Sequence, residues 1–277
     1  MKMEHSISLI CDVIIIKRLG YYRESIKKER PRYKTNIKLL KMIRQIYEAS
    51  GRRYGSPNIH REIIKKGYKV TRKRIESLMR KNNIRAELGK KRKYKRNTAE
   101  CLKNAENCVK QNFDIKKKDK VIVSDITEIK SAEGKSYLCI MMDLYSRRIK
   151  SWKLSRRATG ELVKECLIKA VKGVSEKEKL IFHTDKGTQY TSEEVMKTVE
   201  LFGIRKSFSG KGNCYDNAPA ESFFATLKKE EIYRNSYKTH KELELSLFKY
   251  IDIFYNKIRP HSNNAGLSPE EYEILNT

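Results

Sequence analysis

Two β-rich runs joined by a short polar turn constrain the fold of this chain more than any other feature of its sequence. Val121–Lys130 and Ser136–Tyr145 are rich in β-branched and aromatic residues, and the turn between them contains Gly134. This pattern is typical of a β-hairpin. A third run of the same kind, Arg147–Leu154, follows directly. We therefore predict three successive antiparallel strands.

The chain after these strands alternates between helical and extended patterns. Apolar residues recur at spacings of three and four over Thr159–Val174, which predicts a helix. The predicted elements that follow are strand Leu180–Thr184, helix Ser192–Phe202, strand Ile204–Phe208, helix Ala218–Tyr233 and helix Thr239–Asn256. Antiparallel strands followed by alternating helices and strands predict a mixed α/β sheet.

Charge divides the chain into a basic front half and a nearly neutral back half. Residues 1–120 contain 36 Lys and Arg against 12 Asp and Glu, whereas residues 121–277 contain 26 against 22. The net charges are +24 and +4, which together make the +28 of the chain. This asymmetry is typical of a nucleic-acid-binding region attached to a separate working domain. A lysine-rich genome is the alternative explanation, but it would raise the charge of both halves alike.

The basic half carries helical patterns broken by turns. Residues 1–50 predict a helical segment, because apolar residues recur at spacings of three and four near its end. Residues 51–86 predict two short helices around a tight turn, the first capped by Ser56 and the second by Thr71. Two short helices of this kind are typical of a helix-turn-helix.

The second of these short helices begins with three basic residues, Arg72, Lys73 and Arg74. A helix-turn-helix places the start of its second helix on DNA, so these side chains are candidate DNA contacts. An ordinary helical hairpin with solvated charges is the alternative. Residues 87–120 are polar and lysine-rich, which predicts a basic linker that lies along phosphates or serves as a solvated tether. Residues 121–277 then form the last domain.

The cysteines and the apolar segments exclude several classes of protein. No two cysteines have the Cys-x-x-Cys spacing of a zinc ribbon, and no disulfide framework is indicated, so we expect idle or buried thiols in a reducing compartment. The apolar run Ile7–Leu19 is short, contains Asp12 and lacks a small-residue cleavage site. We expect a cytoplasmic protein with no membrane segment. The six cysteines are Cys11, Cys101, Cys108, Cys139, Cys166 and Cys214.

Three acidic residues stand out in the nearly neutral half. Asp125 lies in the middle of the first predicted strand, Asp185 follows the short buried strand, and Glu221 lies on a predicted helix. A carboxylate among β-branched residues is costly to bury unless it is paired or binds a cation. For each acid taken alone, a salt bridge to one of the many lysines is the simplest explanation, and a bound metal ion is the alternative.

Long motifs around these acids occur in a fixed order. They are Ser124–Ile129, Asp143–Arg148, His183–Ser192, Ser207–Ala218, Glu221–Lys228 and Phe254–His261. This set resembles the catalytic core of retroviral integrases and of bacterial insertion-sequence transposases, in particular the type encoded by the second reading frame of two-frame elements. The 35 residues between Asp185 and Glu221 match the family's interval. One departure is Ile122, where the family often has Trp.

The resemblance implies an RNase H-like fold in which Asp125, Asp185 and Glu221 converge and hold two Mg²⁺ ions, for which Mn²⁺ can substitute. It also implies a DNA transposase that cleaves element ends and then transfers the freed strand into target DNA. Hard oxygen ligands suit these cations and disfavour zinc. Two divalent cations outweigh three carboxylates, so the site becomes more cationic where phosphate charge grows in the transition state.

Further residues are candidates for DNA contact. Lys228 lies seven residues after Glu221, two helical turns along the same face, although a solvated lysine is the alternative. The other candidates are Lys211 and Asn213 in the preceding loop and Arg259 in the tail motif. His183 either orients a ligand beside Asp185 or is a packed histidine at a strand end.

The resemblance also implies partners. These are double-stranded DNA, a homo-oligomer assembled on that DNA, and a fused or separate first-frame protein with a helix-turn-helix and a coiled coil, because this chain has no sustained heptad run. A metal-dependent nuclease of the same fold and an inactive DNA-binding relic or regulator are the alternatives. A serine recombinase is disfavoured because Ser207 and Ser222 have no neighbouring His–Asp pair.

Overall fold

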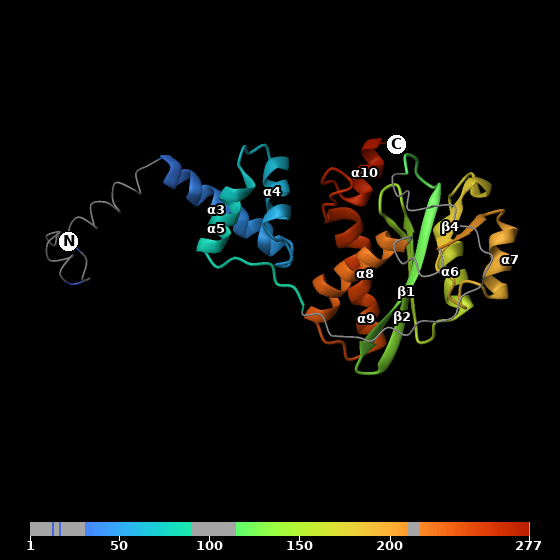
Figure 1. Ribbon diagram of the computed structural model, residues 1–277. Coiled ribbons are helices and arrows are strands. Elements are labelled where there is room, and N and C mark those ends of the chain that lie inside the picture. The colour runs from blue at the N-terminus through green and yellow to red at the C-terminus, as the bar shows by residue number, and fades with distance from the viewer. Residues whose placement is uncertain (1–12, 14–16, 18–30, 90–114, 210–216, 277) are drawn as a thin grey trace. The chain divides into compact units, whose positions relative to one another are not determined.

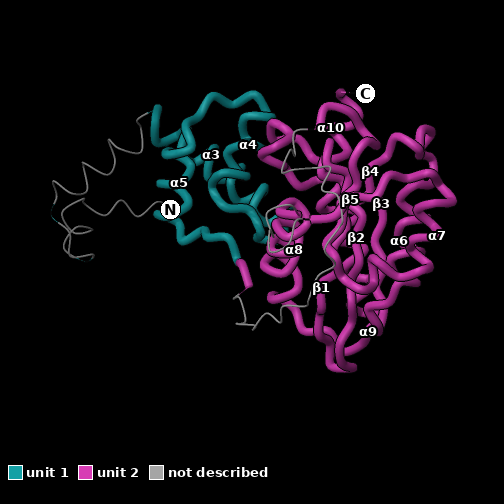
Figure 2. The backbone as a smooth tube through the Cα atoms, turned by 45° about the vertical axis from the view of Figure 1, so that its right-hand side comes forward, with its two compact units in different colours: residues 1–87 teal, residues 88–277 magenta. Residues whose placement is uncertain are grey.

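The computed structural model describes residues 31–89, 115–209 and 217–276, together with Val13 and Lys17. The chain divides into two compact units, residues 1–87 and residues 88–277 (Figure 2). Two of the predicted DNA contacts, Lys211 and Asn213, lie outside the described residues, as does most of the predicted basic linker.

In residues 31–87, the continuously described part of the first unit, three helices pack around a small apolar core. They are α3 (Pro31–Ala49), α4 (Ser56–Lys65) and α5 (Arg72–Lys81). Gly67, in the turn between α4 and α5, has a φ of 81°, a left-handed conformation that favours glycine. The two short helices predicted around a tight turn are therefore confirmed. The buried apolar side chains are Leu39, Ile43, Ile46, Tyr47, Tyr54, Ile59, Ile63, Ile75 and Met79.

The predicted helix caps of this unit are only partly correct. Helix α4 begins at Ser56 itself, so Gly55 occupies the cap position and no side chain caps the helix. Thr71 does occupy the cap position of α5, but its hydroxyl makes no capping hydrogen bond. Tertiary contacts hold α5 instead, because the Arg74 guanidinium donates hydrogen bonds of 2.9 and 2.8 Å to Asn36 Oδ1 on α3.

The second unit is built on a five-stranded mixed sheet with helices on both faces (Figure 1). Strands β1 and β2 pair antiparallel, as do β2 and β3, whereas β4 runs parallel to β1 and β5 runs parallel to β4. This confirms the predicted mixed sheet. In spatial order the strands are β3 (Ile149–Ser155), β2 (Gly134–Asp143), β1 (Val121–Ser131), β4 (Ile181–Thr184) and β5 (Arg205–Phe208).

Helices α6 and α7 lie on one side of the sheet, and α8 and α9 lie on the other (Figure 1). The main core lies between the sheet and the first pair, where Ile122, Cys139, Cys166 and Phe182 are all fully buried. Cys139 and Cys166 are free thiols, as expected. The helical elements are α6 (Gly160–Val171), α7 (Glu193–Leu201), α8 (Ala218–Glu230), α9 (His240–Phe248), α10 (Pro269–Asn276), the π-helix η4 (Lys249–Ile258), and the 3-10 turns η1 (Lys177–Lys179) and η3 (Ile232–Arg234).

Several predicted bounds shift for local reasons. Strand β3 begins at Ile149 rather than Arg147, because Arg147 has a φ of 63° and belongs to the turn. Helix α8 ends at Glu230, and the last predicted helix divides into α9 and the wider η4. Helix α10 was not predicted. Among the helices of the described residues, none is long and apolar enough to cross a membrane.

Candidate active site

The sheet brings two of the three predicted acids to neighbouring strands. Asp125 lies in the middle of β1, opposite Ile140 of β2. On the other side of β1, the parallel strand β4 pairs His183 with Val123. Asp185 comes two residues after His183, immediately past the end of β4. The register therefore carries Asp185 to the level of Asp125.

A buried amide brings the third acid toward the same strand. Asn217 is the cap residue of α8, and Glu221 lies in the first turn of that helix. The Asn217 side chain is 6% exposed and donates a 3.1 Å hydrogen bond from Nδ2 to the backbone oxygen of Ser124. Ser124 directly precedes Asp125 in β1. The start of α8 is thus fixed beside the strand that carries Asp125.

Ser124 also connects β1 to the segment that follows Asp185. Its hydroxyl lies 3.0 Å from the Tyr190 hydroxyl, and both side chains are fully buried. Three chain segments, one for each predicted acid, therefore meet at Ser124. The sequence motifs contained Ser124, Tyr190 and Asn217, but no role was predicted for them, because side-chain hydrogen bonds across 66 and 93 residues leave no local pattern.

The electrostatics of Asp125 show that these charges act on one another. Burial, together with the nearby Asp185 and Glu221 carboxylates, raises the pKa of the Asp125 carboxyl to about 7, against the opposing influence of the Ile126 backbone N–H and Lys228. Burial also raises the pKa of Asp185, which the Gly187 backbone N–H opposes. Negative charge accumulates here in a partly desolvated place, and a bound cation would stabilise it.

The carboxylates are close but are not gathered into a coordination sphere. No group of three or more His, Cys, Asp or Glu side chains within the described ranges is arranged to hold a metal ion. Asp125 Oδ1 instead accepts a 2.8 Å hydrogen bond from the Ile126 N–H, and Asp185 Oδ1 accepts a 2.9 Å bond from the Gly187 N–H. These side chains would have to rotate to share a cation. The donor set itself, three carboxylates, fits Mg²⁺ or Mn²⁺.

Lys228 lies near this cluster, as its helical spacing predicted. Burial lowers the pKa of its ammonium, and the carboxylates of Asp125 and Glu128 oppose that effect. Lys229, the next residue of α8, is exposed. The structure therefore distinguishes two adjacent lysines that the sequence could not separate.

His183 is a packed histidine of the core. It is fully buried, its Nδ1 lies 2.8 Å from the Ser207 hydroxyl, and its Nε2 lies 3.2 Å from the Ser209 hydroxyl. These contacts connect β4 to β5 and the residue that follows it. Of the two interpretations of His183, the structure favours the packed strand-end histidine.

The remaining candidate DNA contacts differ in how exposed their side chains are and in whether they pair within the protein. Arg72 and Lys73 are exposed at the start of α5, whereas Arg74 is partly buried against Asn36. Arg259 forms a 2.9 Å ion pair with Glu230, and the two side chains are only 17% and 10% exposed. The Arg259 guanidinium is thus bound by a carboxylate of the protein itself.

The tail motif that contains Arg259 packs the C-terminal helices onto the rest of the unit. The Tyr255 ring stands edge-on to Phe223 of α8 and to His261, at 4.7 Å between ring centres in both cases. Asn256 makes two 3.0 Å hydrogen bonds with the backbone of Ile149 on β3. This motif therefore has a structural role that positions α8 and β3.

Comparisons with known proteins agree with this architecture. Models of the integrase core domain match residues 116–214 and 221–276, and a model of an HTH-like domain matches residues 35–93. The predicted fold class, an integrase-type RNase H-like core preceded by a helix-turn-helix-like segment, is confirmed. The catalytic core domain of BIV integrase is a solved structure with 19% identity and a TM-score of 0.43, covering 57% of this chain and 95% of that one.

Relatives of known type cover nearly the whole chain. The transposase InsF of insertion sequence IS3A from Escherichia coli (strain K12) is 32% identical over 275 residues, which are 99% of this chain and 96% of InsF. The transposase of insertion sequence element IS904 from Lactococcus lactis is 35% identical over 240 residues, 86% of this chain and 94% of that protein. The chain therefore belongs to the bacterial insertion-sequence transposases of the integrase superfamily and is a DNA transposase.

Proposed function

We propose that Asp125, Asp185 and Glu221 are the catalytic carboxylates of this transposase and that together they hold two Mg²⁺ or Mn²⁺ ions. The observation that carries this proposal is the meeting of three chain segments: β4 ends at the level of Asp125, and the Asn217 side chain holds the start of α8 at Ser124, next to Asp125. The pKa of Asp125, which is raised to about 7 by burial and by the other two carboxylates, supports it. Carboxylates that repel one another in the metal-free protein are stabilised by a shared cation.

The reaction follows from this arrangement. Bound divalent cations would activate the attacking oxygen and stabilise the leaving oxygen at phosphorus. The carboxylates fix the position at which both oxygens lie in line, and Lys228 offers its ammonium to a neighbouring phosphate oxygen. Water first cleaves a phosphodiester at the element end, which frees the 3′-hydroxyl of the element and leaves a 5′-phosphate on the flanking strand.

The second step uses the same groups. The freed 3′-hydroxyl attacks a phosphodiester of the target, forms a new phosphodiester with the target 5′-phosphate and releases a target 3′-hydroxyl. One phosphodiester is formed for each one broken, so no nucleotide cofactor is required. The positions of Asp125, Asp185 and Glu221 serve both steps because both are in-line displacements.

The first unit provides the DNA grip in this proposal. Arg72 and Lys73 are exposed at the start of α5, where a helix-turn-helix contacts DNA, and Arg74 holds α5 on α3. We propose residues 1–50 as a helical segment, 51–86 as the DNA-binding segment, 87–120 as a basic linker and 121–277 as the catalytic core. Lys211 and Asn213, in the stretch before α8, are proposed to contact DNA as well, whereas Arg259 supports α8 through Glu230.

The assembly and partners belong to the same proposal. Both ends of an element must be joined to one target, so we propose a homo-oligomer on double-stranded DNA. A first-frame protein with a helix-turn-helix and a coiled coil would supply end recognition, as a fusion or as a separate chain. Because the relatives are transposases of bacterial elements, the protein would act in the cytoplasm on nucleoid DNA.

A strand-transfer assay tests this proposal directly. With Mg²⁺ or Mn²⁺ and duplexes of the element's terminal repeats, Asp125→Asn, Asp185→Asn and Glu221→Gln should each lower joining at least about a thousandfold and keep DNA affinity. The matched control is Glu200→Gln, an exposed acid on α7 that should leave joining unchanged. Joining by any of the three site variants at the control rate would remove that residue from the site. A wild type that cleaves ends but never joins them would be a nuclease of this fold.

A further inference from the structure

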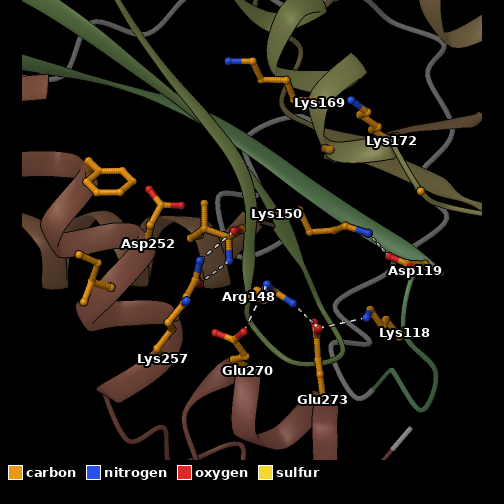
Figure 3. A pocket seen from close by; sticks show the side chains of 16 residues that line it. Lys118, Asp119, Arg148, Lys150, Lys169, Lys172, Asp252, Lys257, Glu270 and Glu273 are labelled. Carbon is orange, nitrogen blue, oxygen red and sulfur yellow. Dashed lines mark hydrogen bonds and ion pairs between the residues drawn. The ribbon is translucent and has the colours of Figure 1, made fainter. Parts of the chain in front are cut away.

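A second charged hollow lies on the catalytic unit, away from the three acids. It has a volume of about 480 Å³ and is bounded by the end of α6, the start of β3, the π-helix η4 and α10 (Figure 3). Six basic and four acidic side chains line it. Strand β3 is one of the two edge strands of the five-stranded sheet and is separated from β1 by β2.

The acids of this pocket already have partners. Glu273 accepts hydrogen bonds from the Ser146 hydroxyl at 2.7 Å and from Arg148 at 2.8 Å, and it also pairs with Lys118 at 3.1 Å. Lys150 pairs with Asp119 (Figure 3).

The other two acids are engaged as well. Asp252 accepts a 2.7 Å hydrogen bond from the Trp152 indole, and Glu270 lies 4.0 Å from Arg148. Glu273, Glu270 and Asp119 therefore face Arg148, Lys118 or Lys150, whereas Asp252 faces a neutral donor. These four acids and three bases sum to a charge of −1.

Three lysines of the same pocket are left over. Lys169 and Lys172 come from the end of α6, and Lys257 comes from the last turn of η4 on the opposite wall (Figure 3). All three are exposed and have no ion pair within the described ranges of the chain. A basic residue in the last turn of a helix is common because it complements the helix dipole. Three such residues around one hollow, where three of the four acids already face a cation, are more than that effect requires, and they give the pocket a net charge of +2.

The pocket is too far from the acids to share their phosphate. Ile149 in its wall pairs with Met142 of β2, which pairs with Val123 of β1. Two strand spacings amount to about 10 Å, and Asp125 lies two residues farther along β1. A phosphate held by the lysines is therefore a different phosphate from the one that reacts.

We propose that Lys169, Lys172 and Lys257 form a second phosphodiester-binding site, which holds the backbone of double-stranded DNA beside the catalytic core. The inference rests on the proposed DNA-joining function. A duplex bound at the three acids extends well beyond one phosphate, and a cationic hollow on the same unit would fix its direction. Phosphate is the anion that matches, because three ammonium groups with free donors provide point charges and not the planar fork that recognises carboxylates.

The salt dependence of DNA binding tests this second site without requiring the catalytic reaction. Binding of a fluorescent duplex to the full chain is measured by anisotropy at increasing salt, with EDTA present to prevent cleavage. The triple variant Lys169→Gln, Lys172→Gln, Lys257→Gln should bind more weakly and reduce the slope of log affinity against log salt by about 2 to 3, roughly 0.9 per lost phosphate contact. The control triple variant Lys197→Gln, Lys238→Gln, Lys241→Gln removes the same charge elsewhere on this unit.

Each outcome separates the possibilities. Equal slopes for the two triple variants would overturn the second site while leaving the proposed catalytic function intact. A wild type with no salt-dependent DNA binding would overturn both. Poly-glutamate distinguishes a protein partner. If the lysine triple variant binds poly-glutamate more weakly than the wild type does but keeps the DNA slope of the wild type, the site binds an acidic polypeptide and the proposal is wrong.

Discussion

Two regions of the catalytic unit use carboxylates in opposite ways. At the catalytic edge, which comprises Asp125, Asp185 and Glu221, burial and the neighbouring charges raise the pKa of Asp125 to about 7. In the C-terminal clamp, which comprises the pairs Glu230–Arg259 and Glu273–Arg148, each carboxylate faces a guanidinium at 2.9 or 2.8 Å.

The difference between repelling and paired carboxylates indicates the role of each region. Compensated charges hold helices together, and removing one partner leaves a buried charge alone. Charges that repel one another in the free protein favour a bound cation instead. One type of side chain therefore serves the fold in the clamp and, in our proposal, the chemistry at the edge.

The largest effect on stability should come from breaking the clamp. Arg259→Ala leaves Glu230 buried without its cation, so the free energy of unfolding should fall by about 3–5 kcal/mol, measured by denaturant unfolding. Arg156→Ala is the control, because Arg156 pairs with Glu133 at the surface, where solvent screens the pair, and its loss should change stability far less. Equal losses in the two variants would mean that the clamp is no different from a surface ion pair.

The clamp also shows what the sequence could not predict. The strands, the acids and the 35-residue interval follow from local patterns and motifs, and the structure confirms the strands. Arg259 was predicted to contact DNA, yet it pairs with Glu230, 29 residues earlier in the chain. Such pairs depend on how helices are placed in space, and no spacing in the chain encodes that placement.

Local geometry limited the prediction at other points. Arg147 takes a positive φ that no motif indicated, and α9 widens into a π-helix where the pattern predicted a continuous α-helix. At the catalytic edge, the motifs supplied the acids but not Asn217, which fixes α8 to β1. Local motifs indicate residues with a chemical role more readily than residues that hold two distant segments together.

The next-largest predicted effect is a loss of strand transfer at the catalytic edge with little loss of stability. Asn217→Ala removes the hydrogen bond to Ser124, so Glu221 should lose its fixed position, and strand transfer should fall about 10- to 100-fold. The melting temperature should change much less than in Arg259→Ala. Tyr190→Phe, which removes only the contact with the Ser124 hydroxyl, should have a smaller effect of the same kind. A rate loss that follows the loss of stability in both variants would contradict a positioning role.

A smaller effect distinguishes the adjacent lysines of α8. Lys228→Gln should lower strand transfer about tenfold at low salt, since a charge-assisted hydrogen bond to phosphate contributes about 1.5 kcal/mol or more. Lys229→Gln should stay within about twofold of the wild type, because Lys228 is the lysine of this pair whose charge acts on Asp125. Equal losses would indicate that both lysines act only through overall charge.

The smallest effect concerns the pH dependence of the clamp. Although burial alone raises the pKa of Glu273, hydrogen bonds from Ser146 and Arg148 hold it below its usual value. A carboxyl whose pKa is lower in the folded state contributes stability above its unfolded pKa, and this contribution is lost as the pH falls through the folded value. Unfolding measured from pH 7 to pH 3 should therefore show a steeper loss in the wild type than in Glu273→Gln. Parallel curves would contradict the pairing.

The central claim is that three distant acids share divalent cations, and iron-directed cleavage of the polypeptide tests it most directly. Fe²⁺ substituted for Mg²⁺, with ascorbate and peroxide, cuts the backbone close to the bound metal. The account predicts cuts near Asp125, Asp185 and Glu221 in the same chain, which excess Mg²⁺ suppresses and Asp125→Asn abolishes. Cuts that miss one of the three segments, or that persist in Asp125→Asn, would contradict it.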